Sequence, residues 1–174
     1  ISEVGFGGIP IIRLDKASAV RVLQRAFDRG ITFYDTAAAY HDSEEKMGCA
    51  FEGMRRKVVI ATKTLRRDAK GALRDLERSL RMLKTDTIDL FQLHQIAQDN
   101  VWERVTAPDG ALEAALKARE QGKIRFIGVT SHSIPMALKL VKAGLFSTIQ
   151  FPFNFIETEA EKDLCRQVRA RGLG

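Results

Sequence analysis

The sequence predicts an α/β fold, a (β/α)8 TIM barrel, of which the chain holds about the first six βα units. Short apolar runs rich in β-branched residues alternate strictly with longer amphipathic runs. The short runs are apolar throughout, which is typical of a parallel sheet covered by helices. Ionisable residues follow the ends of these runs, where the strands of a barrel gather catalytic groups.

The first half of the chain contains three strand–helix units. "EVGFGG", "ITFY" and "KVVIATK" are the predicted strands, and helices follow at residues 15–30, 42–53 and 68–83. Asp15 offers a cap for the first helix and Gly30 a stop. Apolar residues recur at helical spacing in the first and third helices. These stripes comprise Ala19, Val22, Leu23, Ala26, Phe27, Leu73, Leu76, Leu80 and Leu83.

The second half repeats the pattern. Strands are predicted in "TIDLFQLH", "KIRFIGVTSH" and "FSTIQFPF", and helices at residues 109–122, 134–144 and 158–172. The last two residues, "LG", look like the start of a seventh strand. Because no linker, repeat or low-complexity stretch divides the chain, residues 1–174 are predicted to form a single partial barrel domain.

An open doubly wound sheet is the alternative architecture. A dinucleotide-binding sheet of that kind carries GxGxxG turning directly into a helix. "GFGGIP" departs from this pattern, because Pro10 stands where the third glycine belongs and several residues precede the helix. The barrel is therefore favoured.

The composition is that of an ordinary globular protein, with 45% hydrophobic and 29% charged residues. No apolar run approaches the roughly 18 residues of a membrane span, so no membrane role is expected. Two distant cysteines, Cys49 and Cys165, favour a reduced, cytoplasmic protein without a metal site. The net charge of +6 is scattered along amphipathic helices. This distribution favours basic side chains on a solvated surface over a basic pocket entrance that attracts an anionic cofactor or substrate. It also disfavours nucleic-acid binding.

Four ionisable residues follow three successive predicted strands: Asp35 and Tyr40 the second, Lys63 the third and His94 the fourth. Singly, each has a structural explanation as a turn, packing, surface or hydrogen-bonding residue. Together they would meet at one rim of a barrel. There they form a chemically coherent set. The tyrosine would act as an acid, the lysine would lower the pKa of the tyrosine, the carboxylate would hold the lysine, and a neutral histidine would orient a polar substrate.

On these residues the chain resembles the aldo-keto reductases over essentially its whole length. The signature G-x-x-x-x-D-T-A-x-x-Y-x-x-S-E-x-x-x-G runs from Gly30 to Gly48, and "ATK", "DLFQLH", "GKIRFIGVT" and "TIQFPFN" follow in the family's order. "GFGGIP", "YHDSEEKMG" and "PFNFIE" are most similar to a bacterial and archaeal branch. Members of that branch often carry a ferredoxin-like iron-sulfur tail, which this chain does not contain.

The resemblance implies a (β/α)8 barrel that transfers hydride from NADPH, with NADH left open, to the carbonyl of a small aldehyde or ketone. Tyr40 would be the general acid, Lys63 would lower its pKa, Asp35 would hold Lys63, and His94 would orient the carbonyl. The implied cofactor-binding residues are Gly8, Asp35, Thr130, Ser131, His132 and Gln150. Family members often have Gly-Val-Ser-Asn after the fifth strand, where the Ser and Asn hold the carboxamide of nicotinamide. Here Thr130 keeps the hydroxyl, Ser131 replaces the amide, and His132 is expected to supply the lost contact.

Three further expectations follow. The family's later strands and phosphate loops lie beyond "RGLG", so the chain is expected to be part of a longer enzyme, for which an electron-transfer partner or iron-sulfur extension is left open. A non-enzymatic, cofactor-binding regulatory barrel of the same family is one alternative. A metal- or phosphate-dependent barrel enzyme of another class is a second, although "VGFGG" has no HxH ligand pair.

Overall fold

Parallel strands form one curved sheet whose spatial order follows the chain, β1-β2-β3-β4-β5-β6. The structure is a computed structural model and describes residues 1–156, 158 and 161–174. The strands are β1 Gly5–Gly7, β2 Phe33–Asp35, β3 Val59–Thr64, β4 Ile88–Leu93, β5 Ile124–Thr130 and β6 Thr148–Gln150. A doubly wound sheet reverses its strand order partway. This sheet does not, so the alternative architecture is wrong.

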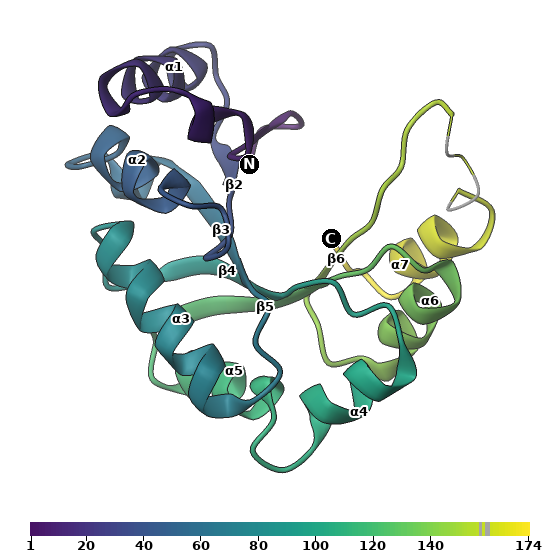
Figure 1. The fold of residues 1–174 in the computed structure, drawn as a ribbon. Helices are drawn as coiled ribbons and strands as arrows, with labels where there is room; N and C mark the ends of the chain where they lie inside the picture. The colour runs from purple at the N-terminus through teal and green to yellow at the C-terminus, as the bar shows by residue number, and fades with distance from the viewer. Residues whose placement is uncertain (157, 159–160) are drawn as a thin grey trace.

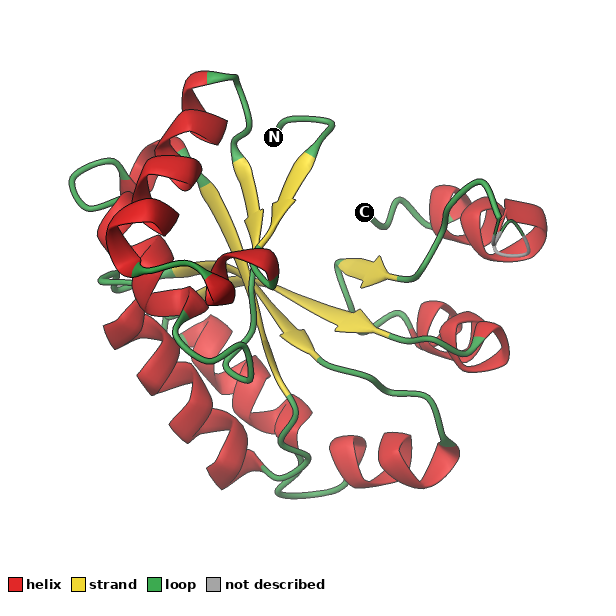
Figure 2. Cartoon of the chain, turned by 45° about the horizontal axis from the view of Figure 1, so that its top comes forward, coloured by secondary structure: helices red, strands yellow, loops and turns green. Residues whose placement is uncertain are grey.

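The helices cover the outer, convex side of the sheet (Figures 1 and 2). They are α1 Lys16–Asp28, α2 Ser43–Ala50, α3 Ala69–Met82, α4 Asp99–Thr106, α5 Ala111–Glu120, α6 Ile134–Ala143 and α7 Arg166–Ala170. Short 3-10 turns lie at Pro10–Arg13 and Arg55–Lys57, and a π-helical turn lies at Glu161–Cys165. The result is a partial (β/α)8 barrel, which confirms the predicted fold.

Local sequence explains most helix boundaries. The carboxylate of Asp15 accepts a hydrogen bond from Ser18 N at 2.9 Å, and that of Asp68 accepts from Gly71 N at 2.7 Å, so both cap a helix start. Gly144 ends α6 with φ of 67°, in the left-handed region that glycine adopts without strain. At Gly48 a side chain is excluded, because a Cβ would lie 2.1 Å from Met82 O. This glycine lets α2 pack closely against the end of α3.

The core lies between the sheet and the helices. Leu23, Met47, Ile60, Leu76 and Phe91 are among its fully buried members. Two residues of the predicted stripes, Val22 and Leu73, are instead 41% and 38% exposed, because they lie at the edge of the buried helix face. The inner face of the sheet carries a largely apolar cavity of about 640 Å³, lined in part by Phe33, Leu90 and Phe126.

The structure differs from the prediction in several places. The helix α4 was not predicted. The strand β6 ends at Gln150 and not at residue 153. The predicted helix at 158–172 is a π-helical turn followed by α7, with residues 159–160 outside the described part. No strand is assigned at residues 173–174, where a seventh was expected, but Gly174 lies beside β6: Gly174 O accepts from Ile149 N at 3.0 Å and Gly174 N donates to Ser147 O at 3.1 Å.

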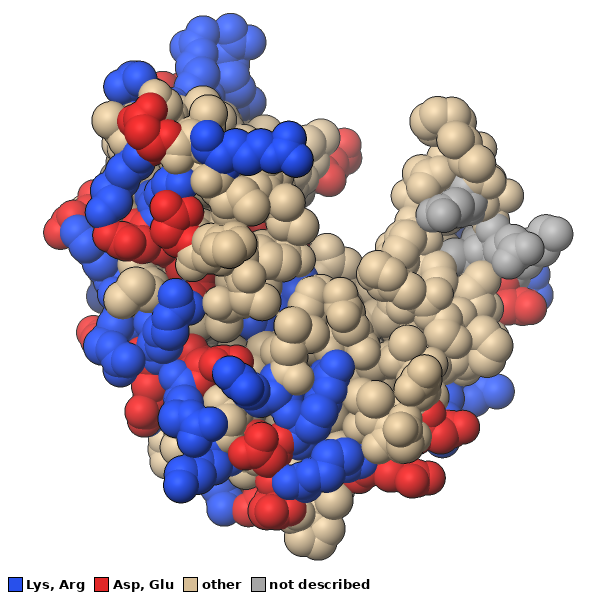
Figure 3. Space-filling model, in the orientation of Figure 1, with Lys and Arg blue, Asp and Glu red and all other residues tan. Residues whose placement is uncertain are grey.

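Within the described residues, no helix is both long and apolar enough to cross a bilayer. On the face seen in Figure 3, Lys and Arg side chains lie mostly over the outer helices, and other residues line most of the hollow. This distribution agrees with a solvated surface as the main location of the positive charge.

Candidate active site

The carboxyl ends of β2, β3 and β4 bring the four predicted residues together. Asp35 ends β2, Lys63 lies next to the end of β3, and His94 follows β4 directly. Tyr40 lies in the loop between β2 and α2. Neighbouring parallel strands end at one edge of a sheet, so these side chains meet there. A cavity of about 200 Å³ is lined by Tyr40, Lys63, His94, Thr130, His132, Gln150, Phe151 and Pro152.

Lys63, which lines this cavity, forms an ion pair with Asp35, which lines the larger cavity of the sheet. Lys63 Nζ lies 2.6 Å from Asp35 Oδ2 and donates to Thr36 O at 2.8 Å. The Lys63 side chain is only 1% exposed, so it does not extend to water as a surface lysine would. Burial lowers the pKa of Lys63, and the charge of Asp35 opposes that shift. The pair therefore places a buried cation beside the cavity.

Tyr40 lies against this cation. Lys63 Nζ is 5.2 Å from the centroid of the Tyr40 ring. Burial raises the pKa of Tyr40, and the charge of Asp35 raises it further. This direction is opposite to the lowering expected from Lys63, because burial and the Asp35 carboxylate both disfavour the phenolate. The phenol is consequently protonated at neutral pH and available as a proton donor.

His94 faces the edge of Tyr40, with ring centroids 6.3 Å apart and planes at 79°. Its side chain is buried, and its Nδ1 lies 2.8 Å from Thr130 Oγ1. Burial lowers the pKa of His94 to about 4, and the positive charges of Lys63, Arg67 and His132 contribute. A neutral imidazole is the form that was expected here.

This pKa predicts a pH dependence of folding stability. The pKa of an unfolded histidine is ~6.5, whereas burial lowers that of His94 in the folded protein to about 4. Between these values the unfolded chain binds a proton that the folded chain does not, so the free energy of unfolding should fall as pH falls through this window. Urea unfolding of the complete protein and its His94→Gln variant, measured from pH 7 to pH 4, checks this. The free energy of unfolding should fall less with decreasing pH in the variant than in the wild type. An identical pH dependence in the two proteins would contradict the lowered pKa of His94.

The expected cofactor-binding residues differ in how they lie relative to the cavity. Gln150 and His132 are exposed and line the cavity. Ser131 is fully buried, and its hydroxyl accepts from Ser133 N at 3.2 Å at the start of α6. Gly8 packs under α2, where an added Cβ would lie 2.5 Å from Ser43 Oγ. Thr130 lines the cavity, but its hydroxyl already contacts His94 and Gln95 N.

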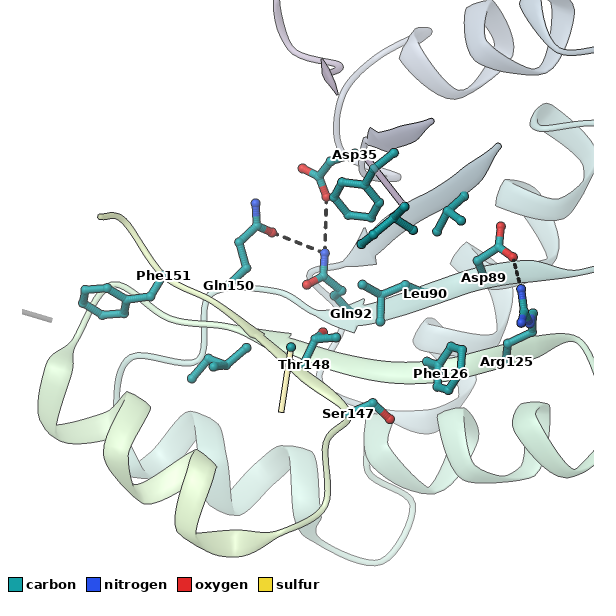
Figure 4. Close-up of a pocket in the computed structure, with 15 residues that line it drawn as sticks. Asp35, Asp89, Leu90, Gln92, Arg125, Phe126, Ser147, Thr148, Gln150 and Phe151 are labelled. Carbon is teal, nitrogen blue, oxygen red and sulfur yellow. Dashed lines mark hydrogen bonds and ion pairs between the residues drawn. The ribbon is translucent and has the colours of Figure 1, made fainter. Parts of the chain in front are cut away.

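Gln92 was missed by sequence reasoning. Its Nε2 lies 3.3 Å from both Asp35 Oδ1 and Gln150 Oε1, and Figure 4 shows it between these two side chains. It thus connects the ion pair to the outer cavity residue. The signal was present in "DLFQLH", because a strand residue two positions before His94 shares its face of the sheet.

The clamp on the Tyr40 loop was also missed. From α3, Arg78 Nη1 donates to Ala38 O and pairs with Glu44 Oε2, both at 3.2 Å, and its Nη2 donates to His41 O at 3.4 Å. Glu44 is 1% exposed and also accepts from Thr62 Oγ1 at 2.7 Å. The loop is therefore held on both sides of Tyr40.

Removing this clamp should impair catalysis without touching the cavity. In Arg78→Met the loop loses its anchors, and small displacements of a reacting group are costly, so we expect kcat to fall by about 10- to 100-fold. Steady-state kinetics and a cofactor-binding titration check this. Arg74→Met is the matched control, because Arg74 is exposed on the same helix. Equal kcat values for the two variants would contradict a role in positioning Tyr40.

Within the described residues, no group of three or more His, Cys, Asp or Glu side chains is placed to hold a metal ion.

Comparison with known proteins identifies relatives along the whole chain. The sequence model of the Aldo/keto reductase family matches residues 3–174. The aldo-keto reductase YhdN of Bacillus subtilis is 35% identical over 165 residues, which cover 86% of this chain and 48% of that protein. The methylglyoxal reductase YeaE of Escherichia coli is 35% identical over 120 residues, covering 67% of this chain and 40% of that protein.

Solved structures show the same similarity. An aldo-keto reductase from Klebsiella pneumoniae in complex with NADPH has a TM-score of 0.86 and 27% identity, over 99% of this chain and 62% of that one. The holo form of an aldo-keto reductase from Bacillus halodurans has a TM-score of 0.85 and 25% identity, over 100% and 60%. The chain thus spans about half the length of the curated relatives it matches.

Proposed function

Because this chain belongs to the aldo/keto reductase family, we propose that the protein is an NADP-dependent oxidoreductase that reduces the carbonyl of a small aldehyde or ketone to an alcohol. The observation that carries the proposal is the buried Asp35–Lys63 pair with Tyr40 and His94 around one cavity. A buried ion pair is costly to form and is weak evidence for stability alone. This pair lies beside a protonated phenol and a neutral imidazole, and that arrangement supports a catalytic role for the pair.

The cavity residues fit the nicotinamide end of the cofactor. Gln150 Oε1 is oriented by Gln92, which leaves the Gln150 amide nitrogen to donate to a carboxamide oxygen. The His132 imidazole lies on the same wall, and Phe151 and Pro152 supply apolar surface. Lys63 lines the same cavity and is paired with Asp35. When bound, NADPH supplies the hydride that reduces the carbonyl carbon. We propose NADPH over NADH because the similar Klebsiella structure holds NADPH.

Each residue of the set has one role in the proposed reaction. Tyr40 transfers its Oη proton to the carbonyl oxygen as negative charge develops there. Lys63 stabilises the phenolate that remains, because its buried charge acts at short range with little screening. Asp35 and Thr36 O hold Lys63 in place. His94, neutral at working pH, donates a hydrogen bond that orients the carbonyl oxygen.

The substrate class follows from the small cavity and the relatives. About 200 Å³ suits a short carbonyl compound next to a nicotinamide ring, so we propose short-chain aldehydes and 2-oxoaldehydes as the first substrates to test. The methylglyoxal reductase relative supports this choice.

The test is NADPH oxidation by the complete protein with a panel of aldehydes and ketones, accompanied by product analysis. The expected result is carbonyl-dependent NADPH consumption with formation of the matching alcohol. NADPH binding without turnover on any carbonyl would contradict the proposal and favour the non-enzymatic regulatory barrel.

A further inference from the structure

Thr130 lies behind His94, at the carboxyl end of β5. Its side chain is 3% exposed, and its Oγ1 lies 2.8 Å from His94 Nδ1. The same oxygen accepts a hydrogen bond from Gln95 N at 2.8 Å. The Thr130 hydroxyl thus has two partners, the ring of His94 and the backbone nitrogen of the following residue, Gln95.

The backbone around His94 is fixed from several directions. His94 N donates to Thr64 O at 3.0 Å, and Ile96 N donates to Thr130 O at 2.9 Å. Arg67 donates to His94 O at 2.6 Å and to Gln95 O at 3.2 Å. Gln95 has a φ of 56°, which is sterically unfavourable for a residue with a side chain. Such a conformation persists where its surroundings over-determine it. Here it directs Gln95 N toward the Thr130 hydroxyl.

The hydrogen bonds determine where the imidazole proton lies. A threonine hydroxyl has one proton to donate. If His94 Nδ1 carried a proton, Thr130 Oγ1 would accept from both Nδ1 and Gln95 N, and its own buried proton would have no acceptor among the contacts found in the described residues. An unsatisfied buried donor is destabilising. The alternative satisfies every group: Thr130 donates to Nδ1, and the imidazole proton is on Nε2.

We propose that Thr130 is a positioning residue that donates to His94 Nδ1 and so fixes the tautomer in which Nε2–H points to the substrate carbonyl. This inference rests on the proposed reductase function for its use, although the tautomer itself does not depend on turnover. The resemblance implied that this hydroxyl holds the nicotinamide carboxamide. Because the hydroxyl proton is directed to His94, Thr130 has no proton left to donate to the carboxamide oxygen, and that donor role falls to Gln150 and His132, which line the cavity.

The direct test is the 15N spectrum of the histidine side chains of the complete protein at pH 7, with His94→Gln to assign the signals. Wild type should show Nδ1 unprotonated and Nε2 protonated. Thr130→Val, which keeps the shape and removes the hydroxyl, should give a mixture of tautomers, and Thr130→Ser should restore the wild-type pattern. A wild-type protein with the proton on Nδ1 would overturn the proposal even if no variant folds.

Kinetics separates this role from cofactor binding. Thr130→Val should lower kcat by about tenfold or more, with the NADPH dissociation constant unchanged, and Thr130→Ser should recover most of kcat. Thr148→Val is the matched control, because its buried hydroxyl has no hydrogen-bond partner in the described structure and lies away from His94. Weaker NADPH binding with an unchanged tautomer would show instead that the hydroxyl serves the cofactor. A correct tautomer in a protein that reduces no carbonyl would refute the proposed function and leave the Thr130–His94 assignment standing.

Discussion

Tyr40→Phe is expected to lose about 10²- to 10⁴-fold in kcat while NADPH binding stays close to wild type. The substitution removes one hydroxyl and keeps the ring that packs over Lys63 and against His94. Without the hydroxyl, no proton donor of suitable pKa reaches the carbonyl oxygen, so the developing alkoxide must take a proton from water. Steady-state kinetics with an NADPH fluorescence titration separates the two effects.

Tyr34→Phe is the matched control, because Tyr34 and Tyr40 are the two tyrosines of the chain. Tyr34 is fully buried on the helix side of β2, where its hydroxyl donates to Ile31 O at 2.9 Å. Its removal should cost about 1 kcal/mol of stability and leave kcat within a few-fold of wild type. A near-native kcat in Tyr40→Phe would remove Tyr40 from the proposed chemistry.

Lys63→Met is the second substitution with a large expected effect. It removes the buried cation beside Tyr40 and leaves the Asp35 carboxylate unpaired, with its side chain 16% exposed. Breaking a buried pair costs about 3–5 kcal/mol of stability. We expect a large fall in kcat. We also expect the apparent acid pKa in the pH–rate profile to rise further, because the Tyr40 phenolate would no longer have a positive charge nearby.

The double variant Lys63→Met/Asp35→Asn distinguishes folding from catalysis. With both charges removed, the free energy of unfolding should recover much of the loss, because no buried charge remains unpaired. Turnover should not recover, because the cation is still absent. Recovery of kcat together with stability would show that Lys63 acts only by maintaining the fold.

The architecture was predictable because it depends on patterns that a sequence displays directly. Largely apolar strands such as "VVIATK" alternate with amphipathic helices, and strand ends placed Asp35, Lys63 and His94 on one rim. The helix α4 was missed because it is short and because a second helix, α5, follows it before the next strand. The short extent of β6 was missed because apolar residues continue through "FPF" after the strand has lost its partner.

The detailed roles were less predictable, because they depend on side-chain direction. Sequence spacing does not indicate that the Thr130 hydroxyl contacts His94. Nor does it pair Arg78 with backbone oxygens about 40 residues away. The direction of the Tyr40 pKa shift also depends on burial and on the nearby charge of Asp35. Each of these is a property of three-dimensional packing.

The central claim is that the Asp35–Lys63–Tyr40–His94 cavity supports hydride transfer from NADPH to a carbonyl carbon. Incubating the complete protein with an aldehyde and NADPH deuterated at both C4 positions of the nicotinamide tests it most directly. The account predicts an alcohol that carries one deuterium on its carbinol carbon, formed far more slowly by Tyr40→Phe with the label at the same position. An alcohol without deuterium on that carbon, or a wild-type protein that leaves the deuterated cofactor unoxidised with every carbonyl supplied, would contradict it.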